Sequence, residues 1–227
     1  MDPSSSAFEA AVLAYRRSRD PLAVVSLFAA EPVVPGRWRA ETVLTLPVFL
    51  ALVMDGAPAA AAALVDAVRG GDAVKVEVAA QALNYSHHPQ RQRLMERLAG
   101  AAAAGGMDRD GADFAAFAPT HPVHVDMLWM AFLATGDTRY VERVAGLLAG
   151  WMPEPELQAL LAVAGRDDSV REKAMAGVLA NAALVGLTVN ARDMDDVRSA
   201  LEGFAARSEG LAAALASRVL AGITRTP

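Results

Sequence analysis

The chain has 227 residues, of which 54% are hydrophobic, and carries a net charge of −5 at neutral pH. This length supplies enough apolar surface for a buried core, and the lack of cysteine excludes disulfides and thiolate zinc sites. The acidic balance argues against a general nucleic-acid binder, although arginine supplies 19 of the 21 basic residues.

Alanine dominates the composition and favours helices over strands. It occurs 50 times and is the strongest helix former. Ile223 is the only isoleucine, and aromatic residues make up 6% of the chain. Because β-branched and aromatic residues are enriched in strands, we expect an all-α fold.

Helix-start signals recur along the chain. Ser6 and Glu9 form the pattern of a capping box, and Asp20 before Pro21 is typical of a helix start. Asp72 precedes "AVKVEV", whose alternation suggests a strand but whose alanine-rich continuation favours a helix. The expected helices, joined by short loops, span residues 6–19, 20–30, 41–54, 58–69, 73–86, 88–104, 119–136, 138–150, 153–165, 167–186, 193–207 and 208–222.

The most apolar stretch, residues 42–65, contains Pro47 and is interrupted by Asp55, Gly56 and Pro58. Its uninterrupted part, residues 43–54, has 12 residues, whereas a membrane span needs about 20. The first residues lack the basic region and apolar core of a signal peptide. We therefore expect no membrane span and a cytoplasmic protein.

Three windows, residues 64–83, 129–148 and 160–179, share one pattern: an apolar helix, a glycine-containing turn with aspartate, and a second helix. Turn signals near residues 71, 106, 136 and 166 give a spacing near the ~34-residue period of helical-hairpin repeats. A single hairpin cannot bury its own apolar face, whereas stacked hairpins can. The pattern predicts one domain over residues 1–227, an irregular α-solenoid of antiparallel helix pairs with about 12 helices.

The segment "AFLATGDTRYVERVAGLL", residues 131–148, resembles the middle of a tetratricopeptide repeat. Gly136 and Asp137 correspond to the turn of such a repeat. Tyr140 corresponds to the aromatic residue at the start of its second helix. The segment is also similar to a group of uncharacterised bacterial all-helical proteins in which "LW" precedes "ATGD". The resemblance implies a degenerate helical-repeat architecture and no particular chemistry.

All four histidines lie between residues 87 and 124, and two of them suggest a metal site. His121, His124 and Asp126 in "HPVHVD" offer ligand types suited to zinc or iron, and His87 or His88 could complete a set of four. A metal-dependent enzyme or small-ligand binder is therefore one hypothesis. The alternative is that His121 and His124 only satisfy backbone groups at a helix start.

Catalytic and cofactor motifs are missing. The sequence has no G-x-S-x-G elbow, P-loop or G-x-G-x-x-G, so no catalytic residue and no cofactor is expected. We therefore favour a non-catalytic helical scaffold that binds a protein or peptide, with homo-oligomerisation through alanine-rich helices as a further alternative. The candidate groove residues are Tyr85, His87, His88, Trp129, Tyr140 and Trp151.

Overall fold

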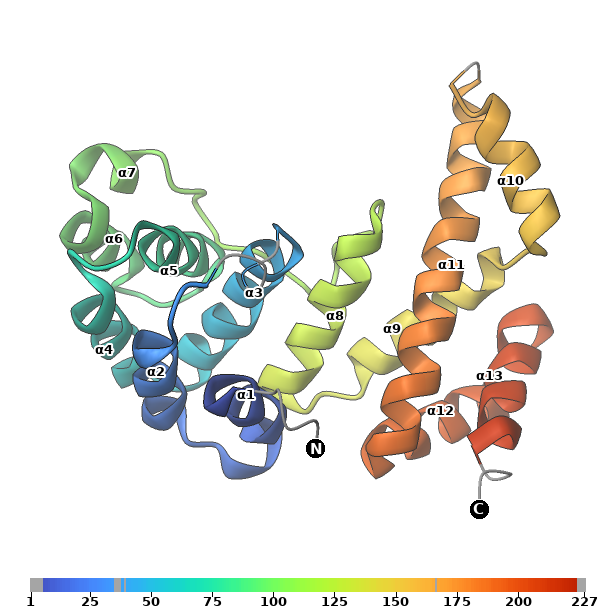
Figure 1. The fold of residues 1–227 in the computed structure, drawn as a ribbon, viewed down its shortest axis with the longest axis horizontal. Helices are drawn as coiled ribbons and strands as arrows, with labels where there is room; N and C mark the ends of the chain where they lie inside the picture. The colour runs from blue at the N-terminus through green and yellow to red at the C-terminus, as the bar shows by residue number, and fades with distance from the viewer. Residues whose placement is uncertain (1–5, 35–37, 39, 166, 224–227) are drawn as a thin grey trace. The chain divides into compact units, whose positions relative to one another are not determined.

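The computed structural model describes residues 6–34, 38, 40–165 and 167–223. In these residues the fold is all-α, with 13 α-helices, one 3-10 helix and no strand (Figure 1). The elements are α1 (Ala7–Ser18), α2 (Pro21–Ala30), α3 (Ala40–Gly56), α4 (Pro58–Val68), α5 (Ala73–Tyr85), α6 (Arg91–Ala99), α7 (Ala101–Gly105), α8 (Pro122–Thr135), α9 (Arg139–Gly146), η1 (Leu147–Gly150), α10 (Glu154–Val163), α11 (Asp168–Asp193), α12 (Asp195–Arg207) and α13 (Gly210–Ile223).

The predicted helix starts are confirmed. The Ser6 hydroxyl accepts from the Glu9 N–H at 3.1 Å, and the Glu9 carboxylate accepts from the Ser6 N–H at 2.8 Å, which completes the capping box of α1. Asp20 caps α2, with Pro21 at its first position. Asp72 caps α5 by accepting from the Val74 N–H at 2.8 Å, so "AVKVEV" is helical.

Two predicted helix boundaries were wrong, and glycine explains both. The helix expected over 88–104 is split into α6 and α7 by Gly100, whose φ of +90° does not fit a helix. The helix expected to end at Gly186 continues to Asp193. Gly186 lies inside α11, where an added Cβ would come within 2.6 Å of the Trp129 indole nitrogen. This glycine therefore provides space for packing and does not end the helix.

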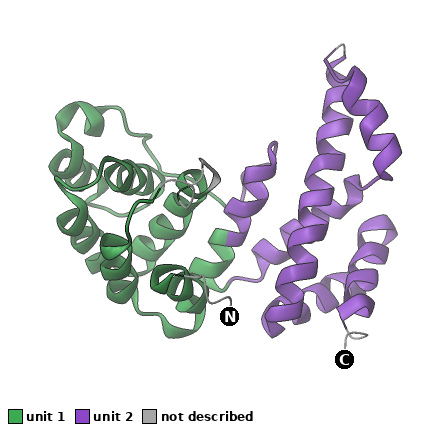
Figure 2. Ribbon diagram, viewed as in Figure 1, with its two compact units in different colours: residues 1–114, 130–136 green, residues 115–129, 137–227 purple. Residues whose placement is uncertain are grey.

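The contacts divide the chain into two compact units (Figure 2). Unit 1 comprises residues 1–114 and 130–136, and unit 2 comprises residues 115–129 and 137–227. Compact units of this size can belong to one domain or to two, so the single domain predicted for residues 1–227 stays a prediction.

In unit 1, most helices pack on a neighbour in sequence, and three pairs of helices two positions apart also pack together. The contacts across two positions are α2 with α4, α3 with α5, and α4 with α6. Phe28, Phe49 and Leu83 are completely buried in this core. Lys75 on α5 is also buried, and its ammonium group donates to the Ala29 carbonyl near the end of α2 at 2.6 Å, where the helix dipole favours a positive charge.

Unit 2 is organised around the long helix α11. The elements α9, η1, α10, α12 and α13 all contact α11, and α9 also contacts α12 and α13. Small residues bring the backbones together. A Cβ added to Gly150 would lie 2.7 Å from the Ala176 carbonyl oxygen, and one added to Gly177 would lie 2.9 Å from Leu157. Larger side chains at these glycines would push α11 away from its neighbours.

Helix α11 is also the one described helix that is long and apolar enough to cross a membrane, with 26 residues and a mean hydropathy of 1.6 in its most apolar window. Length and composition alone are weak evidence, because core helices of soluble proteins share both, and 39% of this window is buried. The expected absence of a membrane span therefore stays a prediction.

The "ATGD" segment forms the turn between α8 and α9. Gly136 has a φ of +70°, which favours glycine, and its N–H donates to the Phe132 carbonyl at 2.7 Å. The Arg19 guanidinium donates to the last carbonyls of α8, at 2.8 Å to Ala134 and also to Thr135. The turn is thus a helix C-cap completed by an arginine distant in sequence.

Candidate functional site

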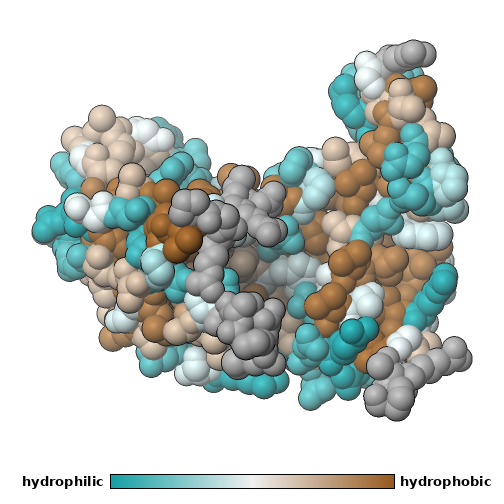
Figure 3. Space-filling view, viewed as in Figure 1, coloured by the Kyte–Doolittle hydropathy of each residue, from teal (hydrophilic) through white to brown (hydrophobic). Residues whose placement is uncertain are grey.

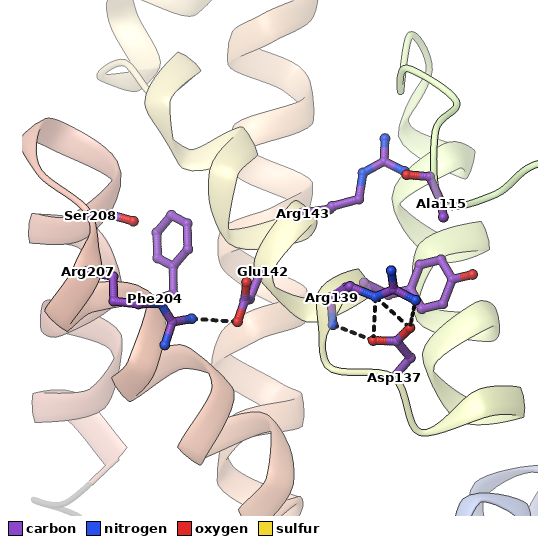
Figure 4. A pocket seen from close by; sticks show the side chains of 9 residues that line it. Ala115, Asp137, Arg139, Glu142, Arg143, Phe204, Arg207 and Ser208 are labelled. Carbon is purple, nitrogen blue, oxygen red and sulfur yellow. Dashed lines mark hydrogen bonds and ion pairs between the residues drawn. The ribbon is translucent and has the colours of Figure 1, made fainter.

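A recess of about 420 Å³ lies in unit 2, and we call it the arginine recess. Helices α9 and α12 provide most of its lining, together with the segment that precedes α8 (Figure 4). The lining residues are Ala115, Asp137, Arg139, Tyr140, Glu142, Arg143, Phe204, Arg207 and Ser208.

At one edge of the arginine recess, Arg139 and Asp137 form a close ion pair. The Arg139 Nε and Nη2 atoms lie 2.8 and 2.6 Å from the Asp137 Oδ2 atom. The hydrogen bonds from Arg139 lower the pKa of the Asp137 carboxyl below its usual value. The Arg139 side chain is 78% exposed, so this guanidinium is also accessible to a ligand.

Arg207 and Arg143 tie other elements to α9. The Arg207 Nη2 atom lies 2.6 Å from the Glu142 carboxylate and so joins α12 to α9 (Figure 4). Arg143 donates to the carbonyls of Ala115, at 2.5 Å, and Phe117, and its guanidinium lies 5.7 Å from the centre of the Phe117 ring. Arg143 therefore holds the segment before α8 against α9.

The recess combines arginine groups with aromatic rings. Phe204 is partly exposed, and the mostly buried Tyr140 contributes part of its surface. Three guanidinium groups and two carboxylates in the lining give a local charge of about +1, within a chain of charge −5. The lining contains no histidine or cysteine. Its groups can hold an anionic or aromatic ligand, but they contain no pairing of a nucleophile with a base.

A second recess, of about 660 Å³, lies in unit 1, and we call it the polar recess. His87 and His88 line it and follow the end of α5. Asp55, at the end of α3, anchors this turn by accepting from the Ser86 hydroxyl at 2.5 Å and from the His87 N–H at 2.9 Å. The Ser86 hydroxyl in turn accepts from the His88 N–H at 2.9 Å.

The group formed by Ser86, His87 and Asp55 resembles a catalytic triad only in composition. In a catalytic triad the serine donates to the histidine, which the carboxylate orients. Here the Ser86 hydroxyl donates to Asp55, and Ser86 is completely buried. The side chain of His87 lies 3.4 Å from the same carboxylate. This arrangement fixes a turn and does not activate a nucleophile.

The segment 106–114 is clamped at the edge of the polar recess. Asn84 and Asp108 exchange two hydrogen bonds, of 2.9 and 3.1 Å, and the Arg91 guanidinium donates to the Asn84 carbonyl at 2.8 Å and to the carbonyls of Asp108 and Arg109. Gly111 has a φ of +72°, and its neighbour Ala112 donates from its N–H to the Tyr85 carbonyl.

Three of the six predicted groove residues lie in unit 1 and three in unit 2. His87 and His88 line the polar recess, and Tyr140 lines the arginine recess. The Tyr85 ring packs edge-on against Phe114, with 5.3 Å between ring centres. Trp129 is 8% exposed and packs at Gly186, so the all-round apolar helix that contains it is core. The sequence shows which side chains are aromatic but not which helix face is covered.

Trp151, the sixth of these residues, lines a separate recess of about 440 Å³ in unit 2 with Met152, Pro153 and Leu211. Leu211, at the start of α13, is 45% exposed. Figure 3 shows apolar surface over part of unit 2. Trp151 and its neighbour Met152 thus line a small, mostly apolar recess.

His121, His124 and Asp126, the three residues predicted as metal ligands, do not converge within unit 2. Among the described residues, no group of three His, Asp or Glu side chains could hold a metal ion. His121 and His124 lie one helical turn apart, with 6.2 Å between ring centres, but Asp126 is about 200° further around α8 from His124. The His121 Nδ1 atom accepts from the Val123 N–H at 3.2 Å, and the His124 Nδ1 atom accepts from the Thr120 N–H at 3.0 Å. Both histidines thus satisfy backbone groups at a helix start.

We expect acid to weaken the fold through His124. Burial, and the neighbouring His121, lower the pKa of His124 below its usual value near 6.5. The unfolded chain then binds the proton more readily than the folded chain, so this contribution to stability is complete above about pH 6.5 and is lost as the pH falls. The expected loss is under about 1 kcal/mol, because the ring is partly exposed. Urea unfolding between pH 8 and pH 5 measures it.

His124→Asn is the matched variant, because its amide oxygen can accept the Thr120 N–H but does not titrate in this range. The slope of stability against pH should be shallower in this variant. An unchanged slope would contradict the role given to His124.

No family model, curated protein or solved structure matches this chain. Arg139 and Arg143, four residues apart on one face of α9, were a sequence signal for the arginine recess that the analysis of single motifs missed. Arg207, which completes the set, lies on α12, and no local pattern predicts that α12 packs on α9.

Proposed function

We propose that this chain is a non-catalytic helical scaffold that binds a segment of a protein or peptide in the arginine recess. The observation that carries the proposal is the pairing of an exposed arginine rim with the Phe204 and Tyr140 rings. Arginine and tyrosine are enriched among the residues that dominate binding at protein interfaces. The recess also combines apolar surface with polar groups at its edge, as binding surfaces do.

We further infer that unit 1 is built as a short irregular α-solenoid. The contacts of α2 with α4, α3 with α5 and α4 with α6 support this inference, since stacked hairpins contact one another in this order. Unit 2 follows a different pattern, because α9 also contacts α12 and α13.

A site-specific crosslinker tests the binding proposal in the intact chain. A photoreactive amino acid placed at Ser208, in the lining of the recess, is expected to crosslink one partner in cells. The same amino acid at Ser217, an exposed position on α13 outside the recess lining, is the matched control. The Ser208 crosslink should be lost when Phe204 is replaced by alanine, with the helical circular dichroism unchanged.

Identical crosslinks from Ser208 and Ser217 would show non-specific capture. If the crosslinks from both positions remained in the Phe204→Ala variant, the arginine recess would not be the binding site. Turnover of a substrate by the purified chain would overturn the non-catalytic part of the proposal.

A further inference from the structure

We propose that the segment bound in the arginine recess is an acidic peptide, with carboxylates beside an apolar or aromatic side chain. This inference rests on the proposed function and names the chemistry of its partner.

The recess already shows its arginines binding carboxylates. Arg207 holds Glu142 at 2.6 Å, and Arg139 holds Asp137 through two of its nitrogen atoms. Arginine donors are fixed in a plane that matches the geometry of a carboxylate, so a site that holds two internal carboxylates can hold others of the same kind.

The exposed arginines have donors left for a second acceptor. A guanidinium carries five N–H groups, and the contact of Arg207 with Glu142 uses one nitrogen of the three. The side chains of Arg207 and Arg139 are 63% and 78% exposed, so their other donors can reach a ligand. An incoming carboxylate can therefore join Glu142 on Arg207 or replace it.

The charge of the lining favours an anionic partner. Its three arginines exceed its two carboxylates, whereas the whole chain carries −5, so the recess is locally positive on an acidic protein. A basic segment would meet Arg139, Arg143 and Arg207, and like charges in contact disfavour the wrong partner. The Phe204 ring, which lies beside Arg207 and Ser208 in the lining (Figure 4), accounts for the apolar side chain in the proposed segment.

A display library of random 12-residue peptides, selected on the full chain, tests this inference. The selected peptides should be enriched in Asp and Glu beside an aromatic or aliphatic residue. Affinities of the synthetic peptides are then measured by fluorescence anisotropy with the wild-type chain and five variants, one of which is Phe204→Ala. Arg207→Gln should weaken binding about 3- to 10-fold, whereas Glu142→Gln should strengthen it, because Arg207 is released from its internal partner.

Arg218→Gln on α13 and Glu202→Gln on α12 are the matched controls, because both positions are exposed and lie outside the recess lining. Each control changes the net charge as its partner variant does, so a general charge effect would move both members of a pair alike. Neither control should change the affinity by more than about 2-fold, since isolated surface charges contribute little. Added salt should weaken binding of the wild-type chain more than binding of the Arg207→Gln variant.

The outcomes separate this inference from the proposed function. Uncharged or basic peptides whose binding is lost in Phe204→Ala would overturn the acidic partner but leave a peptide-binding recess. Peptides that respond to no recess variant, or no selected peptides, would overturn both. If Arg207→Gln instead abolished a dimer seen by light scattering, the occupant would be a second copy of this chain, and the acidic peptide would be rejected.

Discussion

Alanine in place of Gly111 is expected to lower the free energy of unfolding by about 3 kcal/mol, from two additive causes. Its φ of +72° is unfavourable for a residue with a side chain. A Cβ at this position would also lie 2.7 Å from the Ser86 carbonyl oxygen and 2.8 Å from that of Tyr85. Since these are backbone atoms, segment 106–114 would have to move away from the end of α5. Urea unfolding monitored by circular dichroism gives the change.

Two other glycines separate these causes. Gly70 has nearly the same φ, +74°, but has no atom within 4 Å of its added Cβ, so Gly70→Ala should cost only about 1 kcal/mol. Gly105, with an ordinary φ and open space, should tolerate alanine without loss. If Gly111→Ala cost no more than Gly70→Ala, the close approach of segment 106–114 to α5 would be refuted.

The helices could be predicted because their signals are local. The capping box of Ser6 and Glu9, the Asp72 cap, and Pro21 and Pro58 at helix starts each act within one turn, and all four form as expected. Interior glycines were less predictable. Gly186 and Gly100 look alike in sequence, yet one provides space for Trp129 and the other breaks a helix.

The candidate site could not be predicted because it depends on contacts between helices distant in sequence. Arg207 meets Glu142 across 65 residues, and Asp55 meets Ser86 across 31. For His121 and His124 the sequence left two alternatives, metal ligation or hydrogen bonding to backbone groups at a helix start, and their Nδ1 atoms accept from backbone N–H groups. The role of a polar residue such as Arg207 or Asp55 thus depends on a partner that is distant in sequence.

Alanine in place of Asp55 is expected to cost about 2–3 kcal/mol, because it removes an acceptor and leaves its donors behind. The Ser86 hydroxyl is completely buried, so water cannot easily replace the lost partner. The His87 N–H also loses its acceptor, so the turn that follows α5 is no longer held to the end of α3. Chemical denaturation measures the cost, and hydrogen exchange at the His87 and His88 amides should locate it.

Asp55→Asn separates the hydrogen bonds from the charge. An asparagine keeps one acceptor oxygen for the Ser86 hydroxyl and the His87 N–H but lacks the negative charge near the His87 ring, so its cost should be about 1 kcal/mol. Asp66→Ala, on the adjacent helix α4, is the control, because Asp66 is 61% exposed and its ion pair with Arg97 lies at the surface. That variant should change stability by less than about 0.5 kcal/mol. Equal losses from Asp55→Ala and Asp66→Ala would mean that the buried Ser86 hydroxyl finds another acceptor, and that Asp55 does not anchor the turn.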